Sequence, residues 1–263
     1  EYIADHHEKK IQNIINNIDM MASNYKPDSE IALINNSPVN TDLLVSDGLF
    51  HILSIAQSIS KESDGYYDIT LGKISSSMGF SPDFEKNVEN NPLNRSYELN
   101  KSNQTVNKNS FFWFDLSSIA KGYAVQKIHD YLIKNNLPNH LIDIGGEVII
   151  SGTNYSEPWK VGIQDPNSLA SNPIYIIKNT NTSFLSIATS GEYRNFKTNS
   201  LGLIDTHTIN PNSLRSIKPD SLSVTVISSK SATYADGYAT AFNAMSVNKS
   251  IEIANANDIA LML

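Results

Sequence analysis

The sequence contains no cysteine among its 263 residues. This absence excludes disulfide bonds, a cysteine nucleophile and metal sites with cysteine ligands. It fits an exported protein at least as well as a cytosolic one, so the cysteine count leaves the compartment open.

Basic residues are fewer than acidic ones. The 20 Lys and Arg against 27 Asp and Glu give a formal net charge of −7 and an isoelectric point of about 5.3. A broad nucleic-acid-binding face would need an excess of lysine and arginine. We therefore expect no nucleic-acid partner, and we expect any phosphate group to be bound at a local site.

Long apolar runs are also missing. No stretch approaches the roughly 18 to 20 apolar residues that a membrane span requires, and Glu1 opens a polar segment without a positively charged leader. The last five residues, 259–263, have the pattern of a buried strand without a polar tail. We expect the sequence to be trimmed at both ends.

The residues that are present are typical of a globular enzyme, because 263 residues of which 40% are hydrophobic can bury a substantial core. Apolar residues at helical spacing predict four helices, at 6–23, from Asp47 to the turn at Asp64 and Gly65, at 118–135 and at 233–246. Apolar or alternating runs predict strands at 66–70, 111–114, 141–144, 147–150, 159–163, 174–177, 184–188, 222–227 and 259–263.

Residues 81–110 are rich in Asn, Ser, Lys and Glu. We expect an exposed insertion there that carries a small hairpin, with strands at 97–99 and 104–106 around a turn at 100–103. Strands dominate the second half of the chain while helices intervene. The sequence therefore predicts one α+β domain over 1–263, with a mixed or antiparallel sheet as its core and helices packed on it.

Asp236 and Thr240 are spaced i and i+4 within the predicted helix 233–246. Their oxygens therefore project from one face of the helix and can reach a common hard cation. Oxygen ligands in a histidine-poor, cysteine-free chain argue against zinc. Taken alone, the same spacing more often has no metal role: Asp236 would be an acid in the first turn that the helix dipole favours, and Thr240 an ordinary packed residue.

A second chemical pattern lies where the apolar run 111–114 leads into the predicted helix 118–135. Backbone amides and Lys121 can meet an anion at such a junction. From sequence alone, however, Lys121 is more often a solvated lysine and Asp115 a residue at the helix entry.

Seven segments, in order, resemble the FAD:protein FMN transferases, the ApbE-type flavin transferases, over essentially the whole chain. Residues 65–70 resemble the family's Gly-x-Phe-Asp-Ile-Thr, 115–124 its Asp-Leu-x-x-Ile-Ala-Lys-Gly-Tyr-Ala, and 235–241 its Ala-Asp-Ala-Leu-Ala-Thr-Ala. The other four segments are 23–31 with Leu33 and Asn35, 143–147, 188–196 and 207–211. Each segment is a weak signal, but seven in order are highly specific.

The resemblance implies an ApbE-like flavin transferase fold and a magnesium-dependent reaction. FMN would be transferred from FAD to a serine or threonine hydroxyl of an acceptor protein, and AMP would be released. Subunits of membrane redox complexes and exported flavoproteins would be the acceptors. Cleavage of a pyrophosphate depends on charge neutralisation more than on covalent catalysis, which agrees with the oxygen-rich site. The resemblance also implies a periplasmic or other extracytoplasmic location, often as a lipoprotein whose lipid anchor is the membrane contact.

Motif positions imply a role for each site residue. Magnesium would be held by Asp236 and Thr240, together with backbone carbonyls near Ser118 and at Ala239. The residues implied as FAD contacts are Tyr25, Tyr66, Tyr67, Asp68, Asp115, Lys121 and Ile209. Aromatic rings stack on planar heterocycles, although a tyrosine at the edge of a core is the commoner case.

His207 is the candidate general base, because the attacking hydroxyl must lose a proton and a neutral imidazole accepts one near pH 7. Its segment departs from the family's His-x-x-Asp-Pro, because Asn210 stands in place of the aspartate, and Asn212 and Ser213 in place of Thr-Gly. These changes can alter the turn or remove a carboxylate that orients His207. The other five histidines are expected to be surface or packing residues.

Three further departures leave the implied metal ligands intact. Glu192 replaces the aspartate of the segment 188–196, and Gly237 and Tyr238 replace Ala-Leu between the two ligands. Gly237 lowers helix stability by roughly 1 kcal/mol relative to alanine. The family's N-terminal Met-Gly-Thr segment is not in the sequence.

Two other functions stay open at this point. A magnesium-dependent FAD pyrophosphatase would use water as the nucleophile and give FMN and AMP without an acceptor. A non-catalytic FAD-binding protein would hold FAD and release no AMP. The number of metal ions, one or two, is also open.

Overall fold

The computed structural model describes residues 2–82, 95–167, 172–180, 183–191, 196–198, 204–217 and 220–263. Contacts divide the chain into two compact units. The first consists of Glu1–Ala120 and Ile209–Ser216, and the second of Lys121–Thr208 and Ile217–Leu263. Within the described ranges, no helix combines the length and the apolar content that a membrane crossing needs.

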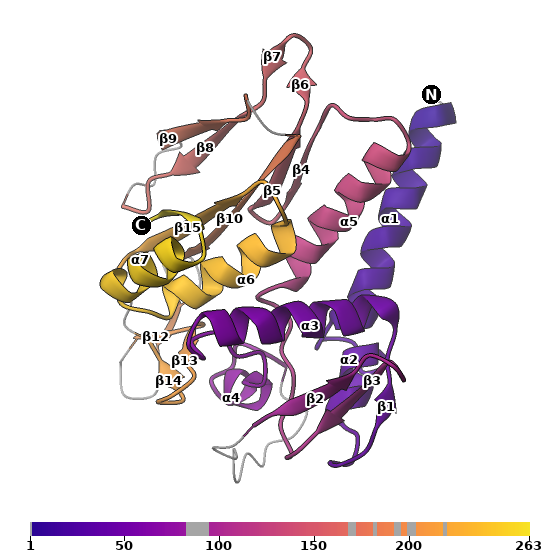
Figure 1. The fold of residues 1–263 in the computed structure, drawn as a ribbon, viewed down its shortest axis with the longest axis vertical. Coiled ribbons are helices and arrows are strands. Elements are labelled where there is room, and N and C mark those ends of the chain that lie inside the picture. The colour runs from indigo at the N-terminus through magenta and orange to yellow at the C-terminus, as the bar shows by residue number, and fades with distance from the viewer. Residues whose placement is uncertain are drawn as a thin grey trace. The chain divides into compact units, whose positions relative to one another are not determined.

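The first unit combines helices with a small antiparallel sheet of order β1-β3-β2 (Figure 1). Its elements are α1 (Tyr2–Ala22), α2 (Glu30–Asn35), β1 (Leu43–Leu44), α3 (Asp47–Glu62), α4 (Gly72–Ser77), β2 (Tyr97–Asn100), β3 (Thr105–Lys108), β13 (Ile209–Asn210) and β14 (Arg215–Ser216). The hairpin expected within 81–110 is confirmed as β2 and β3, while residues 83–94 lie outside the described residues.

Helix α3 shows how local sequence sets its two ends. The side chain of Ser46 accepts a hydrogen bond from the Leu49 amide and so caps the N-terminus, and Asp47 adds an acid in the first turn. Beyond the C-terminus, Asp64 and Gly65 have positive φ values of 52° and 78°. Both ends of the predicted helix are therefore confirmed.

The strand predicted at 111–114 is wrong, although its last three residues are buried. The backbone of Phe114 pairs with a side chain instead: its N–H donates to Asn35 Oδ1 at 2.7 Å, and its carbonyl accepts from Asn35 Nδ2 at 3.0 Å. Among the described residues, the only strand-like pairing of this segment is a single bridge between Leu71 and Trp113. A side-chain amide thus takes the place of a neighbouring strand.

The short strand predicted at 66–70 is also wrong. Asp68 Oδ1 accepts hydrogen bonds from the backbone N–H of Thr70 at 2.7 Å and from its hydroxyl at 2.6 Å. This side-chain-to-backbone bond is the signature of a turn, which competes with extended structure.

The second unit is built on a five-stranded antiparallel sheet of order β16-β15-β10-β5-β4 (Figure 1). Its helices are α5 (Ala120–Lys134, of which Ala120 belongs to the first unit), α6 (Ala232–Asn243) and α7 (Val247–Ala256). Its strands are β4 (His140–Ile144), β5 (Glu147–Ser151), β6 (Thr153–Asn154), β7 (Glu157–Pro158), β8 (Lys160–Gln164), β9 (Pro173–Lys178), β10 (Phe184–Gly191), β11 (Phe196–Thr198), β12 (Ile204–Thr206), β15 (Ser223–Ser228) and β16 (Ala260–Met262). The α+β class with an antiparallel sheet is confirmed.

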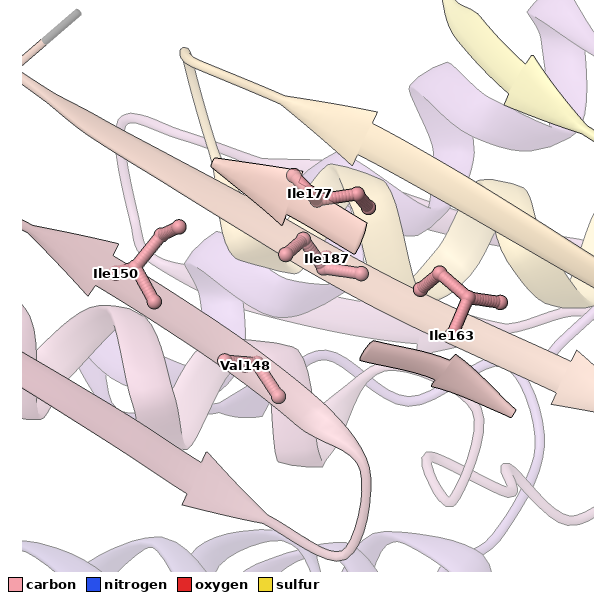
Figure 2. Close-up of a cluster of buried hydrophobic side chains, with 5 residues drawn as sticks. All are labelled: Val148, Ile150, Ile163, Ile177 and Ile187. Carbon is pink, nitrogen blue, oxygen red and sulfur yellow. The ribbon is translucent and has the colours of Figure 1, made fainter. Parts of the chain in front are cut away.

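Strand β5 is buried along its whole length because both of its faces are covered. Val148 and Ile150 point to one face and pack with Ile187 of β10 and with Ile163 and Ile177 of the β8–β9 ribbon (Figure 2). Side chains alternate along a strand, so Glu147 points to the opposite face, where α6 lies against β5 and β10. A buried carboxylate is thereby placed beside α6.

Sequence reasoning missed the short helices α2 and α4, and it missed α7. The predicted helix 233–246 ran too far, because α6 ends at Asn243 and Ser246 caps a new helix by accepting a hydrogen bond from the Lys249 amide. The final strand was expected to be buried, but β16 is an edge strand with partly exposed side chains.

His129 of α5 and His140 of β4 are both buried and hydrogen-bonded to each other, rather than separate surface or packing residues. His140 Nδ1 lies 2.8 Å from the Leu137 carbonyl, which only accepts, so this nitrogen carries the proton. His140 Nε2 is then the acceptor for His129 Nδ1–H at 2.9 Å. Burial lowers the pKa of both imidazoles, and their mutual repulsion lowers that of His129 further.

The histidine pair predicts a loss of stability in acid. Because both folded pKa values lie below the unfolded value of about 6.5, the unfolded chain binds more protons as the pH falls below that value. We expect the free energy of unfolding to decrease there, by at most about 1.4 kcal/mol per pH unit for each histidine. Urea titrations between pH 7.5 and 5 would measure this. Replacing both residues by Gln should flatten the decrease, whereas exposed His6→Gln should leave it unchanged.

Candidate functional site

Asp236 and Thr240 lie on one face of α6, as predicted. The helix is capped by Ser231, whose side chain accepts from the Tyr234 amide. Asp236 is only 4% exposed, and its Oδ2 accepts the backbone N–H of Gly122 at 2.7 Å. Thr240 lies one turn further and is half-buried, and Ala239 beside it is buried. Two oxygen donors thus project from the same side of a rigid helix.

Two more charged groups surround Asp236. Lys121 Nζ forms an ion pair with Glu147 Oε2 at 2.6 Å, and Glu147 is buried. Burial raises the pKa of Asp236 well above its usual range; the negative charge of Glu147 raises it further, and Lys121 opposes the rise. Burial likewise raises the pKa of Glu147, against the effect of Lys121.

Gly122 makes the close approach of α5 to α6 possible. A Cβ at this position would lie 2.5 Å from the Ala232 carbonyl oxygen and 2.5 Å from the Asp236 Cβ, both too short for any side chain. The glycine therefore lets the first turn of α5 present its N–H directly to the carboxylate.

Glu147 is the last residue of the segment 143–147, and the sequence analysis assigns it no role. It begins β5 after a turn in which Gly145 and Gly146 have φ values of 63° and 101°, and in which the Gly146 N–H donates to Asp143 Oδ1 at 2.9 Å. The signal in the sequence was the pair of glycines, which marks a special turn but not the partner of the residue that follows.

The donor set suits magnesium better than zinc. Asp236 and Thr240 supply hard oxygens, and no cluster of three His, Cys, Asp or Glu side chains able to hold a metal occurs among the described residues. Magnesium is commonly held by one or two carboxylates, with its remaining positions filled by water or substrate phosphates. The residues present therefore fit this ion.

The first unit contains a cleft of about 460 Å³. Its lining comes from the end of α3, from Gly65 and residues 67–70, from 95–97 and from Pro211 and Asn212. Of the predicted FAD contacts, Tyr67 and Asp68 lie in this lining. The structure therefore offers a ligand-sized hollow at the segment that the resemblance assigns to FAD.

Asp68 is fixed within the cleft by Arg95, whose guanidinium forms an ion pair with Asp68 Oδ2 at 3.0 Å and donates to Thr70 Oγ1 at 3.1 Å. The Arg95 side chain is 5% exposed and that of Asp68 is 20% exposed. Sequence reasoning missed Arg95, although it is one of only three arginines in the chain and lies in a segment otherwise rich in Asn and Ser.

The predicted aromatic contacts differ in exposure. Tyr25 is 71% exposed, so its ring is free to stack, and its hydroxyl lies 3.4 Å from the Phe80 carbonyl. Tyr66 is half-buried. Tyr67 is buried, and its hydroxyl hydrogen-bonds that of Ser118 at 3.0 Å. Its packing thus fixes the position of the Ser118 segment, from which a backbone carbonyl was expected to bind magnesium.

Asp115 acts locally in the first unit. Its Oδ1 accepts the Ser117 N–H at 3.0 Å, and its Oδ2 accepts the Ser81 hydroxyl at 3.2 Å. The helix-entry role considered for this residue therefore agrees with the turn that it stabilises before α5.

His207 is half-buried and follows β12. The residues on either side of it are anchored in the second unit, because Thr206 Oγ1 donates to the Ile217 carbonyl at 3.1 Å and Asn243 Nδ2 donates to Thr208 Oγ1 at 3.0 Å. Asn243 is the last residue of α6, so the helix that carries Asp236 also anchors the His207 segment.

Asn210 stabilises the turn that follows it, which the replacement of the family's aspartate could have altered. Its Oδ1 accepts the amides of Asn212 at 2.9 Å and Ser213 at 3.0 Å, as an aspartate oxygen would. Ile209 is buried, and its side chain packs against Leu71 and Ile74. Glu192, which stands where the family has aspartate, lies outside the described residues.

The family model named the ApbE family matches residues 2–263. The chain belongs to the ApbE family. The sequence is 30% identical over 273 residues to the FAD:protein FMN transferase of Haemophilus influenzae, with 97% of this chain and 77% of that protein covered. It is 29% identical over 268 residues to the protein of the same name from Vibrio cholerae, with 97% and 78% covered.

Solved structures of ApbE proteins agree with the fold. The flavin transferase ApbE from Vibrio cholerae matches with a TM-score of 0.82 at 28% identity, with 98% of this chain and 84% of that chain covered. The flavinyl transferase ApbE of Pseudomonas stutzeri, in its apo form, matches with a TM-score of 0.84 at 26% identity, with 98% and 82% covered.

The Arg95–Asp68 pair predicts that replacing Arg95 destabilises the protein more than replacing Lys26, which pairs with Asp19 at the surface. Arg95→Met would leave the Asp68 carboxylate without its charge partner in a mostly buried place and should lower the free energy of unfolding by about 2 to 3 kcal/mol. Lys26→Met, in the exposed pair with Asp19, should lower it by less than about 1 kcal/mol. Urea denaturation of both variants would measure the difference, and equal losses would refute a structural role for Arg95.

Proposed function

We propose that this ApbE-family protein transfers FMN from FAD to a serine or threonine hydroxyl of an acceptor protein and releases AMP, with magnesium bound at Asp236. The names of the relatives support flavin transfer to protein. The observation that carries the metal assignment is the buried carboxylate of Asp236. It accepts the Gly122 N–H, and it lies one helical turn from Thr240 on α6. Such a carboxylate has lost its hydration and is positioned for a cation.

The metal would be held by Asp236 and the Thr240 hydroxyl, with backbone carbonyls near Ser118 and at Ala239. It would supply charge neutralisation at the pyrophosphate of FAD. Lys121, whose side chain is 44% exposed beside this site, would bind a phosphate oxygen with the part of its ammonium that faces solvent.

In the proposed step, His207 accepts the proton of the acceptor hydroxyl. The hydroxyl oxygen then forms a bond to the phosphorus of the FMN half, the bond from that phosphorus to the AMP half breaks, and AMP leaves. The FAD contacts are proposed at the cleft residues Tyr67 and Asp68 and at Tyr25, Tyr66, Asp115 and Ile209. We also propose an extracytoplasmic location with a lipid anchor, in keeping with acceptors that are exported or membrane-bound redox proteins.

Mass spectrometry of an acceptor tests this function. The protein would be incubated with FAD, magnesium and a candidate acceptor domain, and AMP, FMN and the acceptor mass would be followed together. We expect an acceptor heavier by one FMN and an equal amount of AMP. Asp236→Asn keeps an oxygen for the Gly122 amide but removes the charge, so it should lower the rate by about 100-fold or more. The exposed Asp130→Asn is the matched control.

Other outcomes distinguish the alternatives. Free FMN and AMP without an acceptor would identify a pyrophosphatase, and bound but intact FAD with every acceptor tried would identify a carrier. Undiminished AMP formation in Asp236→Asn would refute the metal assignment.

A second prediction concerns the general base. His207→Gln should lower the transfer rate by about 100-fold or more while the dissociation constant of FAD stays nearly unchanged, because a general base acts on the hydroxyl proton and not on binding. Stopped transfer assays and fluorescence titration with FAD would measure the two effects. His51→Gln, on the exposed face of α3, is the control. If FAD binding fell in parallel with the rate, His207 would be a ligand contact or a structural residue.

A further inference from the structure

One ammonium lies near two buried carboxylates in the second unit and is paired with one of them. Lys121 Nζ is bonded to Glu147 at 2.6 Å, while Asp236 accepts the N–H of the next residue, Gly122, at 2.7 Å. The positive charge of Lys121 acts on both acids, since it lowers the pKa of each. The ammonium is thus bonded to Glu147, whereas Asp236 accepts a neutral backbone N–H and lies within hydrogen-bonding reach of the Glu147 side chain.

This distribution of partners matters for a divalent cation. An ammonium and a metal ion compete for the same carboxylate oxygens, and a lysine side chain is long and flexible enough to reach either acid. The Lys121 side chain is 44% exposed, whereas that of Glu147 is 5% exposed. The mobile partner is therefore the lysine, and the fixed one is the glutamate.

The fold makes Glu147 a rigid anchor. It begins β5 directly after the Gly145–Gly146 turn, and β5 is buried between α6 and the β8–β9 ribbon. Its register is fixed by pairing with Ile144 of β4. Its carboxylate consequently has little freedom to move toward or away from Lys121.

We propose that Glu147 is a positioning residue that holds the ammonium of Lys121 away from Asp236, and so keeps Asp236 available to a divalent cation. The inference rests on the proposed function, because the cation at Asp236 is part of it. It gives Glu147 a role in cation binding without making it a ligand.

Mn²⁺ binding without FAD tests the inference, because it needs no turnover. Free Mn²⁺ would be measured by electron paramagnetic resonance at one fixed pH for the wild type, Glu147→Gln, Lys121→Met and the double variant. Glu147→Gln keeps the size of the side chain but removes its charge, which frees the ammonium to pair with Asp236. We expect its affinity for Mn²⁺ to fall about 10-fold or more.

The double variant carries the decisive result. With the ammonium removed, Glu147→Gln should no longer matter, and the affinity of the double variant should return to within about threefold of that of Lys121→Met. Lys127→Met, one to two turns further along α5, is the control and should bind Mn²⁺ like the wild type.

Three results would overturn the inference. Wild-type affinity in Glu147→Gln would show that the residue does not influence the site. A double variant as weak as Glu147→Gln would show that Glu147 binds the cation itself or only supports the fold. Loss of thermal stability with unchanged affinity would show a structural role alone.

The proposed function fails in a different way. If Asp236→Asn bound Mn²⁺ as well as the wild type, the cation site at Asp236 would be wrong, and the inference would fall with it. If Glu147→Gln does not fold, Glu147→Asp takes its place, because it draws the carboxylate back by one methylene. Its Mn²⁺ affinity should fall, and combining it with Lys121→Met should restore the affinity to that of Lys121→Met.

Discussion

The hydrogen bond from the Gly122 amide to the Asp236 carboxylate is the contact on which the candidate site depends. It joins the first turn of α5 to the middle of α6 across 114 positions of sequence. It requires glycine, because a Cβ at position 122 would lie 2.5 Å from both the Ala232 carbonyl oxygen and the Asp236 Cβ. Since Lys121 precedes Gly122, the same contact also fixes where its side chain begins. The position of Gly122 thus determines where both the Asp236 carboxylate and the Lys121 side chain lie.

The sheet of the second unit allows charge to be buried beside α6. β5 uses its two faces for different purposes: Val148 and Ile150 pack into the apolar cluster with the β8–β9 ribbon (Figure 2), while Glu147 points toward the helix. A carboxylate at this depth is stabilised only if it has partners. Lys121 provides the partner for Glu147, and the burial of Asp236 beside it raises the pKa of that acid.

The first unit relies on polar side chains in place of regular strands. Asn35 satisfies both backbone groups of Phe114, and Asp68 satisfies the amide of Thr70 while it pairs with Arg95. These bonds explain why apolar segments with a strand-like sequence adopt irregular conformations. The bonds of Asp68 also leave ordered, non-repeating backbone along the cleft, where a ligand can be contacted without competition from a sheet ladder.

The sequence by itself determined the elements whose signals are local. The capped ends of α3, the glycine turn before β5, the β2–β3 hairpin and the i, i+4 spacing of Asp236 and Thr240 all follow from residues within a few positions of one another. Only the tertiary structure decided that Glu147 pairs with Lys121, that Arg95 pairs with Asp68 and that the two buried histidines share a hydrogen bond. The physical reason is that these partners lie 11 to 27 residues apart on different elements, and the fold, not the spacing of side chains, brings them together.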